Sequence, residues 1–122
     1  MTGPGETVVL VDAQNVMRSR WPNLPEDRFV AAVRTWAGRE GVRAVLVFDG
    51  RAPAVPGGEH LDAVGSGARS ADDVIAEEAE RLAAAGVRVH LVTSDRELRG
   101  RAAPFAERIT GGGAFAGTLE AL

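Results

Sequence analysis

The sequence predicts an α/β fold, a three-layer α/β/α sandwich built on a mostly parallel sheet. Three apolar runs rich in β-branched residues lie well apart in the chain, and an acidic residue follows the end of each run. Helical patterns with one apolar face occupy the intervals between these runs. Strands that alternate with helices of this length usually pair in parallel, with helices on both faces of the sheet.

The first predicted elements are a buried strand and an amphipathic helix. Residues 7–11 are apolar and mostly β-branched, as expected for a parallel strand covered on both faces, and Asp12 follows them. Residues 25–40 carry Phe29 and Val33 at helical spacing, with a proline at the start and Gly41 just past the end. These signals place the first strand and its crossover helix in the first third of the chain.

The middle of the chain repeats this alternation. Residues 43–48 form the second predicted strand, which ends before Asp49. The Gly- and Pro-rich residues 51–69 should form a loop at the rim of the sheet, within reach of a substrate, with a short edge strand near residues 60–64. A second helix is predicted over residues 70–85, because Ser70-Ala71-Asp72-Asp73 resembles a capping box with Asp in place of the usual Glu or Gln.

The last third of the chain completes the predicted sheet. Residues 87–92 form the third strong strand pattern, followed by Thr93-Ser94-Asp95. Because Glu97 stands three residues after Ser94, we expect Ser94 to cap a short third helix. A further strand at residues 107–110 and, after three glycines, a last helix ending at Leu122 are indicated more weakly.

Composition narrows the range of functions. The 122 residues match one domain spanning residues 1–122, and the absence of cysteine excludes disulfides, thiolate zinc sites and cysteine nucleophiles. We therefore expect a cytoplasmic protein, and no apolar run reaches the roughly 18 residues of a membrane-spanning helix. The absence of lysine excludes a P-loop and a receiver domain. The net charge of −3 weakly opposes nucleic-acid binding, unless some aspartates neutralise a bound metal.

Acidic residues gather at the predicted carboxyl ends of the strands, where open parallel sheets bind ligands. Asp12, Asp49 and Asp95 follow three strands, and Asp72 begins a helix whose N-terminus should face the same rim. Carboxylates this close repel one another unless a divalent cation neutralises them, and oxygen ligands suit Mg²⁺ or Mn²⁺. We therefore predict a catalytic Mg²⁺ or Mn²⁺ site formed by Asp12, Asp72, Asp95 and Asp49. Any one of these aspartates could instead be a helix cap or turn former, so the prediction depends on their convergence.

Four further residues are candidates for substrate binding, and each has a structural alternative. Asn15 could orient a phosphate or a water molecule, or could form a local turn. Ser94 could act as a helix cap, as a ligand or as both. Arg96 and Arg99 lie near the rim and could bind phosphates, or could belong to a solvated surface. Trp21 could stack on a base or could cover the core.

Four short motifs stand in order along the chain. They are Val11-Asp12-Ala13-Gln14-Asn15-Val16, Phe48-Asp49-Gly50, Ser70-Ala71-Asp72-Asp73 and Val92-Thr93-Ser94-Asp95-Arg96-Glu97-Leu98. Together they resemble the NYN domain family, particularly its YacP-like branch, within the wider PIN-like nuclease group. The resemblance spans nearly the whole chain. It departs from many relatives at Ala13-Gln14, where they carry Gly and an aromatic residue, which puts substrate stacking at that position in doubt.

The resemblance implies a Mg²⁺- or Mn²⁺-dependent endoribonuclease with a PIN-like fold. Asp12 matches the first-strand aspartate of the family, and Asp72 matches its helix-start aspartate. The implied partner is RNA. Whether a ribosome or another protein presents the substrate stays an open question, as does the choice between a monomer and a homodimer. A bound divalent ion acidifies a water molecule and offsets charge on the leaving oxygen, so cleavage should leave a 5′-phosphate and a 3′-hydroxyl. Because water attacks instead of the ribose 2′-hydroxyl, the mechanism alone does not exclude DNA.

The main alternative is a non-catalytic module of the same fold that binds RNA or a nucleotide. Asp12 and Asp72 argue against it, because a pure binder has little use for paired carboxylates near phosphate. A haloacid-dehalogenase-type phosphatase and a toprim-type nuclease both need an Asp-x-Asp pair, which the sequence lacks. Dinucleotide binding needs a glycine-rich turn after the first strand, where this chain has Asp12-Ala13-Gln14-Asn15.

Overall fold

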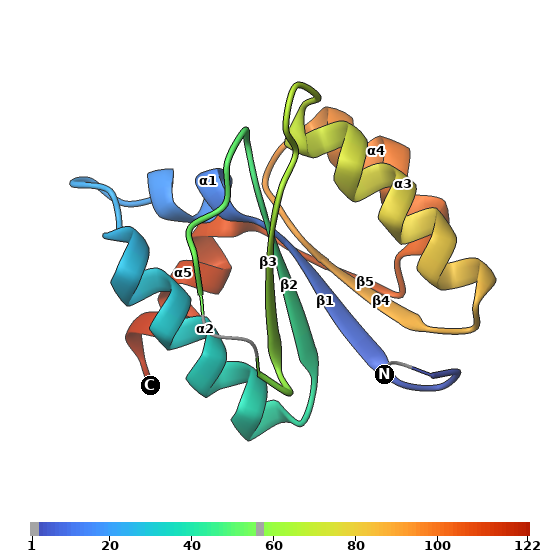
Figure 1. Cartoon of the computed structure of the whole chain (residues 1–122), viewed down its shortest axis with the longest axis horizontal. Helices are drawn as coiled ribbons and strands as arrows, with labels where there is room; N and C mark the ends of the chain where they lie inside the picture. Colours follow the sequence, from blue (N-terminus) through green and yellow to red (C-terminus); the bar gives the residue numbers. More distant parts are fainter. Residues whose placement is uncertain (1–2, 56–57) are drawn as a thin grey trace.

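The computed structural model describes residues 3–55 and 58–122, which fold around a sheet of five parallel strands. The strands are β1 (Thr7–Asp12), β2 (Arg43–Phe48), β3 (Leu61–Gly65), β4 (Arg88–Val92) and β5 (Arg108–Thr110). Their order across the sheet is β3-β2-β1-β4-β5, so β1 lies in the centre (Figure 1). All five strands lie within a residue of the predicted positions.

Helices cover both faces of this sheet. They are α1 (Ala13–Arg18), α2 (Glu26–Glu40), α3 (Ala71–Ala84), α4 (Arg96–Ala102) and α5 (Gly112–Glu120), with a 3₁₀ turn, η1, at Ala103–Phe105. Helices α1, α2 and α5 pack on one face, and α3 and α4 pack on the other (Figure 1). The predicted α/β/α sandwich is therefore confirmed. Within the described ranges, no helix has the length and apolarity needed to cross a bilayer.

The alternation of side chains along β1 explains why the sheet is covered twice. Val9 and Val11 belong to the core under α1, α2 and α5, whereas Val8 and Leu10 belong to the core under α3 and α4. All four side chains are at most 2% exposed. The continuous apolar run of β1 therefore contributes side chains to both cores. Asp12, the last residue of β1, is the first polar group at the rim.

The two long helices begin and end where the sequence signals predict. Gly41 follows α2 in the left-handed conformation, with φ of 66°, which glycine adopts at low cost. Ser70 caps α3, because its hydroxyl accepts a hydrogen bond from the Asp73 N–H at 3.1 Å. The Asp73 carboxylate binds Arg101 of α4 at 2.8 Å, in an ion pair that the sequence did not predict.

The predicted cap of the short helix α4 was wrong. Asp95 caps it, because Asp95 Oδ1 accepts from the Leu98 N–H at 2.9 Å. The Ser94 hydroxyl accepts instead from the Gly112 N–H at 2.8 Å, which ties the end of β4 to the first turn of α5. Ser and Asp are equally good N-caps, so the local sequence could not decide between the two neighbours.

Helix α1 was not predicted. It begins at Ala13 directly after β1, and its buried residues are Ala13 and Val16. Asn15, which we considered as a turn former, lies inside this helix. The chain therefore runs along the rim of the sheet as a helix and carries polar side chains past the end of β1.

The loop predicted at residues 51–69 contains β3, which pairs in parallel with β2 as an edge strand. Residues 56–57 of this loop lie outside the described residues. Gly65 is required at the end of β3, because a Cβ there would lie 2.5 Å from the Gly50 carbonyl oxygen. The Ser66 hydroxyl accepts from the Gly50 N–H at 2.9 Å and donates to the Arg69 carbonyl at 2.7 Å. These contacts fix the backbone that follows Asp49.

Candidate active site

A cavity of about 640 Å³ opens at the carboxyl ends of β1, β2 and β4. Figure 1 shows these strand ends at the top of the sheet. The four acidic residues predicted from the sequence all line it: Asp12, Asp49, Asp72 and Asp95. Two of the predicted polar residues, Asn15 and Ser94, line it as well. The convergence expected from strand topology therefore places six of the eight candidate residues around one space.

Asp12 is the most enclosed of the four acids, with 6% of its surface exposed. Its Oδ2 accepts a hydrogen bond from the Thr93 hydroxyl at 3.0 Å. Burial raises the pKa of Asp12 to about 6, and the charges of Asp72 and Asp49 add to this rise, while the hydrogen bond from Thr93 and the nearby backbone N–H of Asn15 oppose it. A carboxyl group with this pKa gains and loses its proton near physiological pH.

Asp49 joins β2 to the start of α3. Its Oδ1 accepts from the Ala71 N–H at 2.9 Å, at the positive end of the helix, and its own N–H donates to Gln14 Oε1 at 3.0 Å. Asp49 therefore has a structural role at the helix N-terminus as well as a place on the cavity wall. Gln14, on α1, was not among the predicted site residues.

Asp72 and Asp73 are adjacent but lie in different surroundings. Asp72 faces the cavity and is half-buried, and burial, followed by the charges of Asp95 and Asp49, raises its pKa. Asp73 is not among the cavity-lining residues, and the hydrogen bond from Arg101 lowers its pKa. Helix geometry accounts for this division, because Asp72 lies on the same stripe of α3 as Ile75 and Ala79, which pack against the sheet.

Thr93 connects two of the acidic residues and was not predicted as a site residue. It is fully buried directly after β4, and its hydroxyl donates to Asp12 while accepting from the Asp95 N–H at 3.1 Å. The position of Asp95 is thereby linked to that of Asp12. Because the hydroxyl is both donor and acceptor, a valine of similar size could not replace these two bonds.

Asn15 holds two chain segments together at the rim. Its Oδ1 accepts from the Ser94 N–H at 2.9 Å, and a Cβ at position 112 would overlap that same oxygen, so glycine is required there. With the bond from Gly112 to Ser94, these contacts join α1, the end of β4 and the start of α5. The roles proposed for Asn15 and Ser94 toward a substrate stay predictions beside this structural role.

The two arginines predicted to bind phosphate do not line the cavity. Arg96 is exposed on α4, and Arg99 Nε donates to the Thr93 carbonyl oxygen at 2.8 Å. The basic residue on the cavity wall is Arg18, at the end of α1, next to Ser19. The sequence did not point to Arg18 because the helix that carries it was not predicted.

Within residues 3–55 and 58–122, no three Asp, Glu or His side chains lie close enough together to enclose a bare metal ion. The four acids nevertheless offer only oxygen donors around one space, which is the chemistry that Mg²⁺ and Mn²⁺ prefer. Mg²⁺ usually keeps several of its waters and is held through one or two carboxylates. The donor set therefore fits a hydrated ion better than a fully stripped one.

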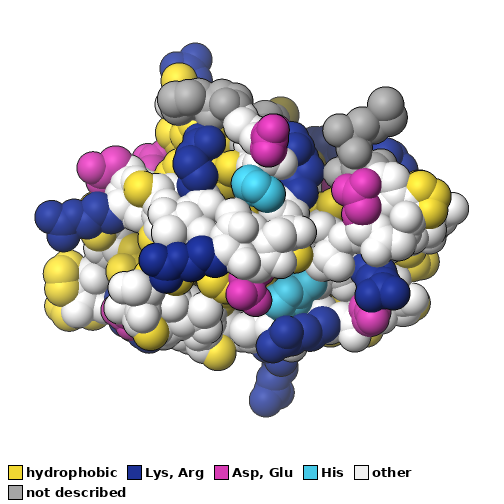
Figure 2. All heavy atoms as spheres, turned by 90° about the horizontal axis from the view of Figure 1, so that it is seen from below, with side chains coloured by type: hydrophobic (Ala, Val, Ile, Leu, Met, Phe, Trp, Pro, Cys, Tyr) yellow, Lys and Arg dark blue, Asp and Glu magenta, His cyan; other side chains and the backbone are white. Residues whose placement is uncertain are grey.

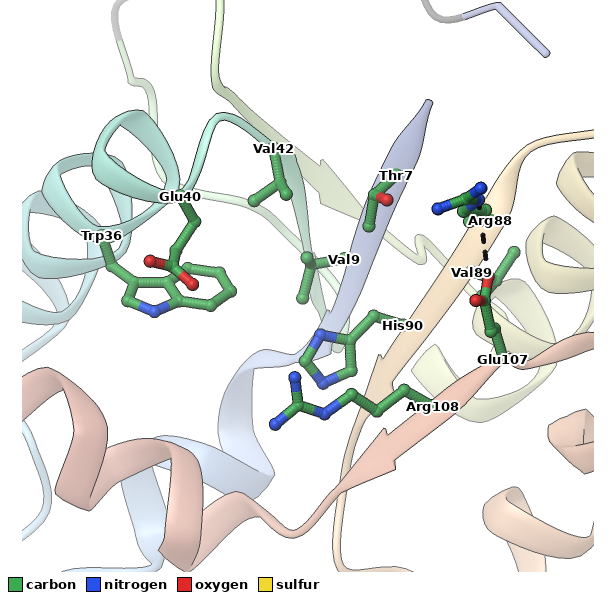
Figure 3. A pocket seen from close by; sticks show the side chains of 10 residues that line it. All are labelled: Thr7, Val9, Trp36, Glu40, Val42, Arg88, Val89, His90, Glu107 and Arg108. Carbon is green, nitrogen blue, oxygen red and sulfur yellow. Dashed lines mark ion pairs between the residues drawn. The ribbon is translucent and has the colours of Figure 1, made fainter. Parts of the chain in front are cut away.

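A second cavity, of about 390 Å³, lies beside the first halves of β1, β4 and β5 and contains none of the predicted acids. Figure 3 shows Trp36 and Glu40 of α2 on one side of it, and His90 and Arg108 on the other. His90 bonds Thr110 Oγ1 at 2.8 Å, and burial, then the charge of Arg108, lowers its pKa to about 4. His90 is thus neutral at physiological pH. Basic and acidic side chains are interspersed over this end of the molecule (Figure 2).

Comparison with known proteins identifies the fold. No protein-family profile and no curated protein sequence matches the chain. The crystal structure of Rae1 (YacP) from Bacillus subtilis superposes with a TM-score of 0.72 at 18% identity, over 93% of this chain and 74% of that one. The structure of its W164L mutant gives 0.74 at 16% identity, over 94% and 76%. The chain therefore has the YacP fold, which agrees with the resemblance carried by its four motifs.

Proposed function

We propose that this protein is a metal-dependent endoribonuclease that hydrolyses RNA phosphodiester bonds at the acidic cavity. The observation that carries the proposal is the convergence of Asp12, Asp49, Asp72 and Asp95 on one space, with Asp12 almost buried among them. Carboxylates held this close together repel one another and destabilise the folded protein, unless a bound ligand neutralises their charges. The preference for RNA comes from the family resemblance.

The residues that line the cavity would have different roles in such a reaction. Asp12 and Asp72 would hold Mg²⁺ or Mn²⁺, with Asp49 and Asp95 beside them, and the metal when bound would supply Lewis acidity toward a phosphate. The raised pKa of Asp12 belongs to the metal-free protein, and a bound cation would hold its carboxylate in the charged form. Thr93 orients the Asp12 carboxylate through the hydrogen bond that its hydroxyl donates.

A binding module without catalysis is the second candidate. The absence of a ready-made three-ligand cluster in the described residues favours it, because a catalytic metal site is usually more compact. The two functions differ in one assay. Mixed single-stranded and structured RNA should be cut in Mn²⁺ or Mg²⁺ and left intact in chelator, with 5′-phosphate and 3′-hydroxyl ends. RNA that binds but stays intact with either metal would establish the module instead.

Divalent metal should also raise the thermal stability of the protein. The cation binds the folded state only, because the unfolded chain disperses the four carboxylates, so a concentration tenfold above its Kd should add about 1.4 kcal/mol. The midpoint of thermal unfolding with Mn²⁺, compared with chelator, measures this. An unchanged midpoint in the wild type, or an equal shift in an Asp12→Asn variant, would show that the metal does not bind at this site.

A further inference from the structure

The loop at residues 19–25, between α1 and α2, begins at the acidic cavity with Ser19 and exposes one aromatic ring. Trp21 is 94% exposed, the highest exposure among the large hydrophobic side chains in the described part of the chain. The loop leaves α1 at the rim of the sheet and projects away from the body of the molecule (Figure 1). An indole held in water is an unusual use of a large apolar side chain.

The loop is anchored at its base, so the position of Trp21 follows from the fold. The Leu24 N–H donates to the Met17 carbonyl at 3.0 Å and closes the loop. The Arg20 guanidinium forms an ion pair with Glu120 at 3.0 Å and donates to the Gly113 carbonyl at 3.3 Å. The loop is therefore tied to α5 at Arg20, before the ring, and to α1 at Leu24, after it, while the ring itself faces solvent.

Arg18 and Ser19 connect this loop to the cavity, because both residues line its wall. Arg18 is exposed, and no hydrogen bond or ion pair of its guanidinium is found in the described ranges. Arg20 differs from Arg18, because the Arg20 guanidinium forms an ion pair within the fold. Arg18 is an exposed cation on the wall of the cavity that the four carboxylates line, and the exposed indole of Trp21 follows three positions later in the chain. A nucleotide requires both features, a partner for its phosphate and a flat apolar surface for its base.

We propose that Arg18 and Trp21 form a subsite for one unpaired nucleotide next to the bond that is cut, with phosphate on Arg18 and the base stacked on Trp21. The inference rests on the proposed function of the acidic cavity. It also assigns a substrate class, since a base inside a duplex cannot offer its face to the indole. A protein surface suits Trp21 less well, because the other exposed large hydrophobic side chains in the described ranges are Val64 on β3 and Leu122 after α5.

The chain contains two tryptophans, which allows a direct optical test. In a Trp36→Phe variant all tryptophan emission comes from Trp21, and in a Trp21→Phe variant it comes from Trp36. With chelator present to prevent cleavage, a short single-stranded RNA should quench the first variant and leave the second unchanged. An abasic strand of the same backbone, or the RNA as a duplex, should not quench Trp21. If Trp36→Phe does not fold, the difference between wild type and Trp21→Phe gives the same signal.

Binding affinities separate the two contacts. Trp21→Ala should weaken binding of the single-stranded RNA by between about 5-fold and about 100-fold and leave the abasic strand unaffected. Arg18→Ala should weaken binding of both strands and reduce the slope of log affinity against log salt by about 1. Arg39→Ala, which removes an exposed arginine of α2 outside the cavity lining, is the charge-matched control and should change neither.

Failure of the subsite and failure of the nuclease can be told apart. RNA that is cut in metal while Trp21 stays unquenched and Trp21→Ala binds normally would overturn the subsite alone. RNA that quenches Trp21 but is never cut would overturn the nuclease and support the subsite. Three results would each overturn base stacking. They are equal quenching by the abasic strand, absence of RNA binding, and Trp21 emission that changes with protein concentration when no RNA is present.

Discussion

Replacing Asp12 with asparagine is expected to stabilise the metal-free protein at neutral pH and to lower the cleavage rate by about 100-fold or more. Asp12 is 6% exposed, and its pKa is raised to about 6. An amide of the same shape carries no charge, so the variant removes an unfavourable buried charge. It also removes a proposed metal ligand, which is why stability and activity should move in opposite directions.

The sign of the pH dependence follows from the raised pKa. Between about pH 4 and about pH 6, the folded protein keeps a proton on Asp12 that the unfolded chain has lost, so the free energy of unfolding falls as pH rises through this window. Below this pH window the Asp12 carboxyl is protonated in both the folded and the unfolded state, so the free-energy cost of burying its charge is absent. A pKa difference of this size corresponds to on the order of 3 kcal/mol above pH 6. The gain in the variant should be smaller, because an asparagine amide is a weaker acceptor than a carboxylate for the Thr93 hydroxyl.

Urea unfolding in chelator, at neutral pH and near pH 4, measures this difference for the wild type and Asp12→Asn. The variant should be more stable at neutral pH, and its advantage should disappear near pH 4. Glu80→Gln removes an exposed carboxylate on α3 and should change the free energy of unfolding by less than about 0.5 kcal/mol at both pH values. A variant that is less stable at neutral pH, or equally stabilised at both, contradicts the electrostatic account.

The sequence predicted most of the fold because its strongest signals are physical requirements of a doubly covered sheet. Residues 8–11 have no polar side chain, and the structure uses both faces of β1 for core packing. Gly41 and Ser70 marked the limits of α2 and α3 because few residues suit a left-handed C-cap or an N-cap. The place of the acids followed from topology alone, since parallel strands end at one rim.

What could not be predicted depends on contacts between distant segments. Helix α1 has six residues, fewer than two turns, so its two buried side chains show no periodicity. Arg18 was missed for that reason. The choice between Ser94 and Asp95 as cap depended on Gly112, which binds the Ser94 hydroxyl from a segment 18 residues away. Thr93 acts through a bond to Asp12 across 81 positions, and a threonine after a strand carries no signal of such a partner.

The adjacent residues Asp72 and Asp73 should give opposite results when each is replaced by asparagine. Asp72 faces the cavity, and its pKa is raised by burial, then by the charges of Asp95 and Asp49, so its charge is unfavourable in the metal-free protein at neutral pH. Asp73 is paired with Arg101, and its lowered pKa means that its charge stabilises the fold at neutral pH and ceases to do so as pH falls.

We therefore expect Asp72→Asn to abolish cleavage with a melting temperature equal to or above that of the wild type, and Asp73→Asn to keep most activity with a slightly lower melting temperature. Cleavage rate and melting temperature must be measured on both variants, because either one alone could reflect a general loss of folding. Arg101→Ala should lower the melting temperature as Asp73→Asn does, and the double variant should add little, since both changes remove the same ion pair. An active Asp72→Asn enzyme, or an inactive but well-folded Asp73→Asn enzyme, would reverse the assignment, because helix geometry directs only the first carboxylate toward the other three.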